Sequence, residues 1–152
     1  MGAVHNAILL APGAEDNGFA VMLSELVRQN LEAKPHKKAD FDSISGSVAI
    51  VAEDAEVAIT LRFASGKLTV FDGIVGIPDV TIRGTSDIIM AMSNLPSTPR
   101  LGLPIAKRGD KEAAELVSSV FRALRSGAFH IHGGLLNAGM MMRFSRVLSV
   151  HG

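Results

Sequence analysis

Strict alternation between positions 57 and 70 is the feature that most limits how this chain can fold. A period of two places every second side chain on one face of a strand, so each run predicts one apolar face. Ser65-Gly66 interrupts the alternation, and a short glycine-containing link between two such runs is typical of a β-hairpin. We therefore expect two antiparallel strands joined at Ser65-Gly66. The core-facing residues are Ile59, Leu61, Phe63, Leu68 and Val70.

Further strands are expected on both sides of this hairpin. Residues 47–53 form the expected strand before it, and Asp79 to Arg83 the strand after it. Thr85 or Ser86 is a suitable N-cap for a following helix, with Asp87 placed favourably in the first turn. A last short strand is expected at 129–132, with its two apolar residues on one face and its two histidines on the other.

Apolar residues at helical spacing predict three more helices. The first follows Asp16 or Asn17 as N-cap and ends at Pro35. The second begins at Asp110 and ends at Ser126-Gly127. The third follows Gly133-Gly134. The apolar positions are, in order, Phe19, Met22, Leu23, Leu26, Val27 and Leu31; Ala113, Leu116, Val117, Val120, Phe121 and Leu124; and Leu136, Met140, Met141, Phe144, Val147 and Leu148.

Four segments show neither the alternation of a strand nor the apolar spacing of a long helix. Residues 1–14 show no periodicity, and His36-Lys37-Lys38 is interpreted as a solvated linker. Phe41 to Ile44 is expected to lead into the first strand. Leu95 to Gly109 contains three prolines and several glycines, so it is expected to be mainly loop.

Composition narrows the function classes. The 152 residues carry 15 basic and 15 acidic side chains, and this balance does not indicate a nucleic-acid-binding surface. The absence of cysteine excludes disulfides and thiol catalysis. Apolar residues make up 47%, with seven Met and neither Trp nor Tyr, so the apolar surface is aliphatic, thioether and Phe. No signal peptide or membrane helix is evident, so a cytoplasmic location is expected.

The run TLRFASGKLTV, followed by a glycine-bearing turn and PDVTIRGTSDII, resembles the sterol carrier protein type-two family. The likeness extends to Gly46-Ser47-Val48-Ala49-Ile50 upstream and to residues 126–133 downstream, and covers most of 45–150. It implies an α/β (α+β) fold, with a five-stranded, mostly antiparallel sheet covered on one face by helices. It also implies an apolar tunnel between the two layers that accepts sterols, fatty acids, acyl-CoA or isoprenoid lipids.

We expect a single domain over 1–152. Residues 1–40 would be an N-terminal extension and helix, and 41–152 the sterol carrier protein-like region. Leu95 to Gly109 is longer than the corresponding family connection, so we interpret it as an insertion near one end of the tunnel.

The final helix is the strongest site candidate, because the resemblance places it beside the tunnel. Methionine suits a wall that adapts to ligands of varied shape. Plain core packing explains the same apolar stripe without a ligand, and both interpretations stay open. Arg143 and Arg146 lie on the polar side of this helix and could meet a lipid head group. The candidate ligand-binding residues are Met140, Met141, Phe144, Val147, Leu148, Leu136, Phe121, Ile89 and Met92.

The remaining chemistry is sparse. His130 and His132 point the same way, but a metal site needs a third ligand and solvent-facing histidines are the simpler interpretation. No nucleotide-binding or nucleophile-elbow motif occurs. We therefore expect non-catalytic binding of a hydrophobic small molecule or lipid, without cofactor or metal, and with transient membrane contact. The alternatives are an accessory protein of a lipid or quinone pathway that uses its apolar surface to form a homodimer, and an enzyme acting on a lipophilic substrate.

Overall fold

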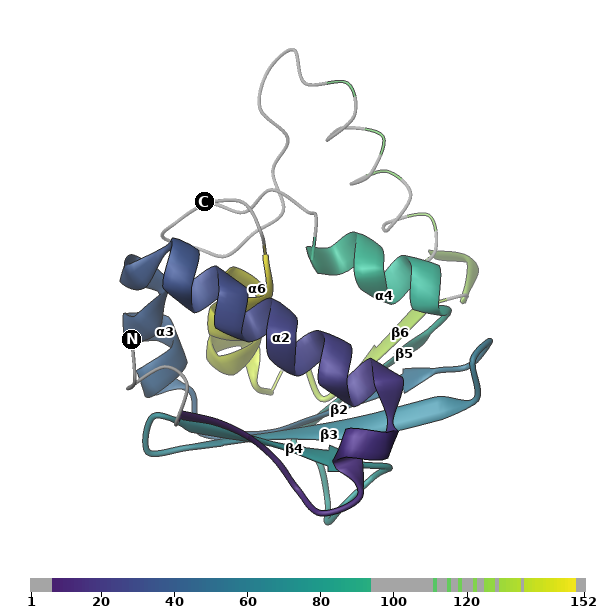
Figure 1. Ribbon diagram of the computed structural model, residues 1–152. Coiled ribbons are helices and arrows are strands. Elements are labelled where there is room, and N and C mark those ends of the chain that lie inside the picture. Colours follow the sequence, from purple (N-terminus) through teal and green to yellow (C-terminus); the bar gives the residue numbers. More distant parts are fainter. Residues whose placement is uncertain are drawn as a thin grey trace.

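The protein has two layers, a six-stranded sheet and a set of helices lying over one of its faces (Figure 1). The computed structural model describes residues 7–93, 111, 115, 118, 122, 125–127, 129–134 and 136–149, without the side chains of 91–93. This mixed α/β arrangement is the expected class. The sheet has one strand more than the five that were expected.

The strands pair in the order β1-β4-β3-β2-β5-β6. Three neighbouring pairs are antiparallel (β2/β3, β3/β4 and β5/β6), whereas β1/β4 and β2/β5 are parallel. The sheet is therefore mostly antiparallel, as expected. The strands are β1 (Ile8–Leu10), β2 (Gly46–Ala52), β3 (Val57–Ala64), β4 (Lys67–Asp72), β5 (Val80–Gly84) and β6 (Phe129–His132).

The predicted hairpin is confirmed. Ala64 pairs with Lys67 across the turn. Ser65 and Gly66 both have positive φ, 52° and 73°, which matches the twist of a tight two-residue turn. All five residues expected on its apolar face are buried: Ile59, Leu61, Phe63, Leu68 and Val70.

The additional strand, β1, lies where no regular structure was expected. Ile8 to Leu10 adds to the edge of the sheet in parallel with Leu68 to Val70. Three residues are too few to show a period of two, so the sequence pattern could not reveal this strand. Its pairing depends on residues about sixty positions away along the chain.

The helices are α2 (Gly18–Ala33), α3 (Lys38–Ser43), α4 (Ser86–Ser93) and α6 (Ala138–Leu148), with short 3-10 turns η1 (Ala14–Asp16) and η2 (Pro35–Lys37). Of the helix expected from Asp110, the described residues Lys111, Glu115, Ser118, Arg122, Arg125 and Ser126 are helical. The apolar face of that helix and the segment 95–109 lie outside the described residues, so the insertion remains a prediction.

Asn17 is the N-cap of α2, and it is one of the two residues predicted for that position. Its side-chain oxygen accepts hydrogen bonds from the backbone N–H groups of Phe19 and Ala20, at 3.1 and 3.3 Å. Its amide nitrogen donates to the Asp72 carboxylate at 2.8 Å and to the Ala58 carbonyl at 3.2 Å. One side chain therefore caps the helix and fixes it to the ends of β3 and β4.

Residues 36–44 correct one expectation and extend another. The basic cluster is not a solvated linker, because it forms the end of η2 and the start of α3, and Lys37 is only 3% exposed. Its ammonium group donates to the backbone carbonyl of Ser149. Phe41 to Ile44 leads into β2, as expected. The short helix α3, which was not expected, extends to Ser43 and buries Phe41 in the core.

The connection between β4 and β5, residues 73–79, crosses the sheet on the face opposite the helices, and we call it the strap (Figure 1). Thr60 points to that face and is fully buried. Its hydroxyl donates to the carbonyl of Gly73 at 2.8 Å and accepts from the N–H of Val75 at 3.0 Å. The strap ends where the Asp79 N–H donates to the Ser47 carbonyl at 3.0 Å.

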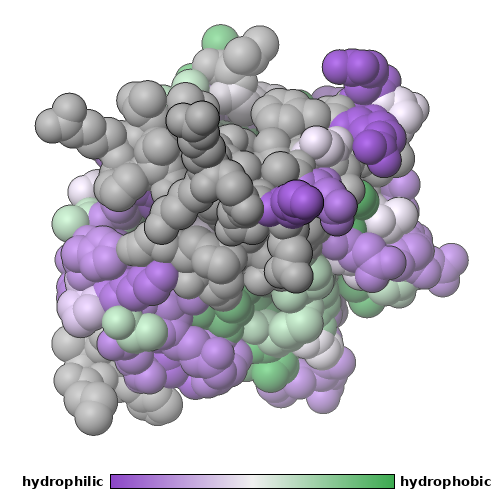
Figure 2. All heavy atoms as spheres, turned by 90° about the horizontal axis from the view of Figure 1, so that it is seen from above, coloured by the Kyte–Doolittle hydropathy of each residue, from purple (hydrophilic) through white to green (hydrophobic). Residues whose placement is uncertain are grey.

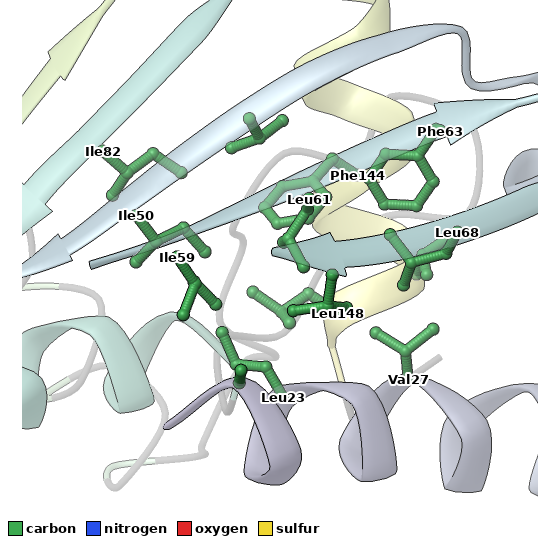
Figure 3. Close-up of a cluster of buried hydrophobic side chains, with 14 of the residues drawn as sticks. Leu23, Val27, Ile50, Ile59, Leu61, Phe63, Leu68, Ile82, Phe144 and Leu148 are labelled. Carbon is green, nitrogen blue, oxygen red and sulfur yellow. The ribbon is translucent and has the colours of Figure 1, made fainter. Parts of the chain in front are cut away.

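The core fills the space between the sheet and the helices. Leu23 of α2 faces Ile59 of β3 and Val27 faces Leu68 of β4 (Figure 3). Phe144 of α6 lies beside Phe63. The N-terminal helix α2 therefore packs on the same core as the strands and α6.

Candidate ligand-binding site

Helix α6 is anchored to the core through its C-terminal half. Phe144 is fully buried and meets Phe63 edge to face, with ring centroids 6.0 Å apart. Phe63 meets Phe41 in the same way at 5.9 Å. Val147 and Leu148 are also buried. Such aromatic pairs add about 0.5–1.5 kcal/mol each beyond the area they bury, so this half of α6 is a structural anchor.

Polar contacts fix the end of α6 as well. The Asn30 side-chain amide donates to the carbonyls of Val147 and Leu148, both at 2.9 Å. Lys37 donates to Ser149, the next residue. Burial lowers the pKa of the Lys37 ammonium group from 10.5 to about 8; Lys34 adds to the lowering and Asp40 opposes it. These side chains satisfy the carbonyls that a helix leaves unpaired at its C-terminus.

Arg146, one of the two arginines expected on the polar side of this helix, forms an ion pair. Its guanidinium group donates to both carboxylate oxygens of Asp40, at 3.0 and 2.8 Å. The two side chains are only 14% and 25% exposed. A two-point pair of this kind holds the guanidinium group in place against α3. Arg143, in contrast, is exposed, as expected for a residue at the rim or in solvent.

The N-terminal half of α6 is more open. Met140 and Met141 are half-buried and pack against the core. The sulfur of Met140 comes so close to Gly46 that a Cβ there would lie 2.7 Å from it. A Cβ built on Gly134 would lie 4.0 Å from Met141 Cγ and 3.0 Å from Ile131 Cγ2. These methionines thus lie between α6 and the strands β2 and β6.

Helix α4 completes this end of the molecule. Ile89 is 2% exposed and belongs to the core, whereas Ile88 and Met90 are half-buried against it. α4 contacts both α6 and β5. The N-terminus of α4 is held by Asp54, whose carboxylate accepts from the N–H and the hydroxyl of Ser86 at 2.7 and 2.6 Å. These hydrogen bonds lower the pKa of the Asp54 carboxyl group below its usual value. The bond from the Ser86 hydroxyl has the larger effect and the bond from its N–H the smaller.

We define the methionine rim as the half-buried apolar side chains that α4, β6 and α6 place against the core. They share partial exposure and the lack of any charged atom. Seen from above, the helical side of the molecule carries apolar surface between hydrophilic residues (Figure 2). The rim consists of Ile88, Met90, Ile131, Met140 and Met141.

The sequence candidates divide into four groups. Phe144, Val147, Leu148 and Ile89 are buried core residues beneath or beside the rim, and Met140 and Met141 belong to it. Leu136 was expected on the stripe of the final helix, but α6 begins only at Ala138 and Leu136 is 93% exposed. Phe121 and the side chain of Met92 lie outside the described residues.

Sequence reasoning missed Ile88, Met90 and Ile131 as site candidates. Ile131 could have been found, because the alternation in β6 puts it on the same face as the buried Phe129. Ile88 and Met90 flank the buried Ile89, and helical spacing alone does not tell a core position from its half-exposed neighbours.

His130 and His132 project from β6 as expected and stack with ring centroids 5.9 Å apart and an interplanar angle of 12°. Both are exposed. Within the described part of the chain, no three histidine, aspartate or glutamate side chains converge where they could hold a metal ion. In the same residues, no helix is long and apolar enough to cross a bilayer.

No protein-family model matches this sequence, and no curated protein matches it. Among solved structures, the chain is similar to "UbiJ-SCP2 Ubiquinone synthesis protein", with a TM-score of 0.54 and 13% identity over 85% of this chain and 90% of that one. The chain has a sterol carrier protein 2-like fold. At this identity the likeness establishes the fold alone.

Two further solved structures are similar at lower scores. A sterol carrier protein 2 gives a TM-score of 0.47 at 14% identity, covering 83% of this chain and 90% of that one. The sec-alkylsulfatase Pisa1 from Pseudomonas sp. gives 0.41 at 18% identity, over 69% of this chain but only 14% of that one. The sterol carrier protein 2-like assignment rests on the first structure, because the other two scores are below 0.5.

Proposed function

We propose that this sterol carrier protein 2-like chain binds a hydrophobic ligand of the lipid class, without catalysis, at the methionine rim. The observation that carries the proposal is the placement of Met140 and Met141, half-exposed above a fully buried core. Apolar side chains left partly open beside α4 and β6 lose hydrophobic free energy that a lipid chain would restore. Methionine also adapts to chains of different shape.

Three ligand classes fit this surface: fatty acyl chains, sterol-like molecules and isoprenoid lipids. The similar solved structure is described as a ubiquinone synthesis protein, which favours trying an isoprenoid quinone early. The rim itself carries no charge, so a carboxylate or phosphate head group would have to lie toward solvent. Arg143 is the exposed cation on the same helix that could pair with it.

The expected affinity is modest. Each buried CH₂ contributes about 0.8 kcal/mol, so a long acyl chain gains roughly 10 kcal/mol, against association costs of about 4–15 kcal/mol. A ligand held this loosely exchanges readily, and exchange is what a carrier requires.

Native mass spectrometry of the freshly purified protein, followed by lipid extraction, is the first test. A co-purified lipid supports the proposal. An empty, stable dimer would instead favour an accessory role in which the apolar surface forms a subunit interface.

A fluorescent fatty acid titration then locates the site. Met141→Ala is expected to weaken binding several-fold, because it removes apolar surface from the rim while leaving the core intact. Met142→Ala is the matched control, since Met142 is the next residue of the same helix but does not belong to the rim. Equal, undiminished binding by both variants would move the site away from α6.

A further inference from the structure

The two most exposed large apolar residues of the described chain lie in the strap and just before α6. Ile77 in the strap is 95% exposed, and Leu136, just before α6, is 93% exposed. Ile74, also in the strap, is 51% exposed. None of these side chains contributes to the core, so folding does not account for them.

The segments that carry Ile77 and Leu136 are joined to each other. The Asn137 side-chain amide donates to the backbone carbonyl of Asp79 at 3.1 Å and to that of Gly133 at 3.0 Å. Asp79 follows Ile77 by two residues, and Asn137 follows Leu136 directly. Gly133 lies so close to the Asp79 carbonyl that any Cβ there would clash with it. The end of the strap and the start of α6 therefore form one continuous edge.

Both exposed side chains stand on backbone that is held in place. The strap is fixed by Thr60 near its start and by two bonds at its end, where the Ser47 N–H also donates to the Asp79 carboxylate at 2.8 Å. A flexible loop could fold an isoleucine inward. A strap anchored at both ends holds Ile77 in solvent.

Cations flank this apolar edge. The guanidinium group of Arg62 lies 4.9 Å from the centre of the Phe71 ring, which fixes its position, and its Nη2 is 3.7 Å from where a Cβ of Gly76 would be. It therefore sits directly beside the strap. Arg143 is exposed on α6, three residues after Met140, whose sulfur lies at Gly46 next to the Asp79 carboxylate. The Asp79 carboxylate, at the end of the strap, accepts a hydrogen bond from the N–H of Ser47.

We propose that this edge, formed by Ile77, Leu136, Arg62 and Arg143, docks the protein onto an anionic lipid bilayer. The two apolar side chains would enter the boundary between head groups and acyl chains, and the guanidinium groups would pair with lipid phosphates. Arginine suits this role because its planar fork binds phosphate oxygens at two points.

The size of the patch favours a membrane over a protein partner. A standard protein interface buries about 800 Å² on each side, far more than two or three aliphatic side chains offer. A bilayer surface needs only a few inserted side chains together with electrostatic attraction.

The edge is also placed for ligand exchange. The Asp79 carboxylate and the Met140 sulfur both lie 2.7 Å from the same Cβ position on Gly46, so the docking edge adjoins the methionine rim. A lipid leaving the rim at this end would meet the bilayer directly. In this respect the inference rests on the proposed function, although docking itself can be measured without any bound ligand.

Vesicle flotation with the full chain tests the proposal. Wild type should bind vesicles of phosphatidylcholine mixed with phosphatidylglycerol more tightly than vesicles of phosphatidylcholine alone, and added salt should weaken the binding. The double variant Ile77→Ser with Leu136→Ser should lower vesicle binding roughly tenfold. Arg143→Gln should remove part of the preference for the anionic vesicles.

Val21→Ser is the matched control, because Val21 is an exposed apolar residue on α2, which contains none of the residues of this edge. It should bind vesicles like wild type. Unchanged melting temperatures would show that all variants are folded, as expected for exposed positions. Vesicle binding equal to wild type in the double variant, or no binding of wild type to either vesicle, would overturn the proposal. A dimer that the double variant dissociates would assign the edge to a second copy instead.

The two proposals fail separately. The double variant should bind the fluorescent fatty acid like wild type in the absence of vesicles. Vesicle binding without any fatty acid binding would contradict the proposed carrier function and support the proposed docking edge. Fatty acid binding without vesicle binding would support the carrier function and contradict the docking edge.

Discussion

Phe144 of α6 meets Phe63 of β3 edge to face, with ring centroids 6.0 Å apart and an interplanar angle of 75°. This contact joins the last helix to the centre of the sheet. It makes Phe144 a core residue that supports the rim from below.

Phe144→Ala should therefore lower the free energy of unfolding by about 3–5 kcal/mol, as for other buried phenylalanines. Urea denaturation followed by circular dichroism measures the change. Phe144→Leu, which keeps most of the volume, is the milder comparison and should cost less. An alanine variant as stable as wild type would show that Phe144 faces an open space and lines the ligand site directly.

Thr60→Val should loosen the strap. The substitution keeps the shape of a fully buried side chain but removes its hydroxyl. The Gly73 carbonyl and the Val75 N–H then lose the hydrogen bonds that they make with this hydroxyl. We expect a loss of about 1–3 kcal/mol and faster hydrogen exchange at the Val75 amide. Thr69→Val, half-exposed on the same face in β4, is the control. Equal exchange at Val75 in both variants would contradict the anchoring role of Thr60.

Asp40→Asn should weaken the attachment of α6 to α3. The two-point bond to Arg146 is mostly shielded from water. A double-mutant cycle with Arg146→Gln should give a coupling of about 1–2 kcal/mol, above the ~0.2–1 kcal/mol typical of exposed pairs. A coupling near zero would mean that the pair only positions the two helices.

Lys37 predicts a rise in stability with pH. Its folded pKa of about 8 lies below the unfolded value of 10.5, because burial disfavours the charged form. Between these values the unfolded chain binds more protons, so the free energy of unfolding increases with pH. The cost of burying the charge is fully present below about pH 8.

The comparison of wild type with Lys37→Met isolates this effect. The stability of wild type relative to the variant should improve by a few kcal/mol between about pH 7 and pH 10.5. Urea unfolding at several pH values measures it. A difference that stays constant over this range would show that Lys37 keeps an ordinary pKa in the folded protein.

Local pattern was enough to predict the hairpin and the N-cap of α2. In each case the signal lies within a few residues: the alternation around Leu61, the turn at Gly66, and the cap Asn17 ahead of an apolar stripe. The resemblance of residues 45–150 to the sterol carrier protein type-two family implied the mostly antiparallel sheet, and the structure confirms that fold.

Contacts distant in sequence were not accessible in this way. Lys37 was expected in solvent because basic clusters usually are, yet it is buried against a carbonyl more than a hundred residues away. Leu136 was placed on a helix that begins two residues later. Among the candidate site residues, periodicity could identify the apolar face of α6 but could not separate the core position Phe144 from the rim positions Met140 and Met141.

Alternation and capping are properties of neighbouring residues, and their physical cause is the fixed geometry of strands and helices. They were sufficient for the type of most elements and for the inner face of each. Which apolar residues end up half-exposed, where the three residues of β1 pair, and how the strap brings Ile77 toward the start of α6 depend on the order of strands in the sheet. That order is set by the burial of the whole apolar surface at once, so only the assembled chain could decide it.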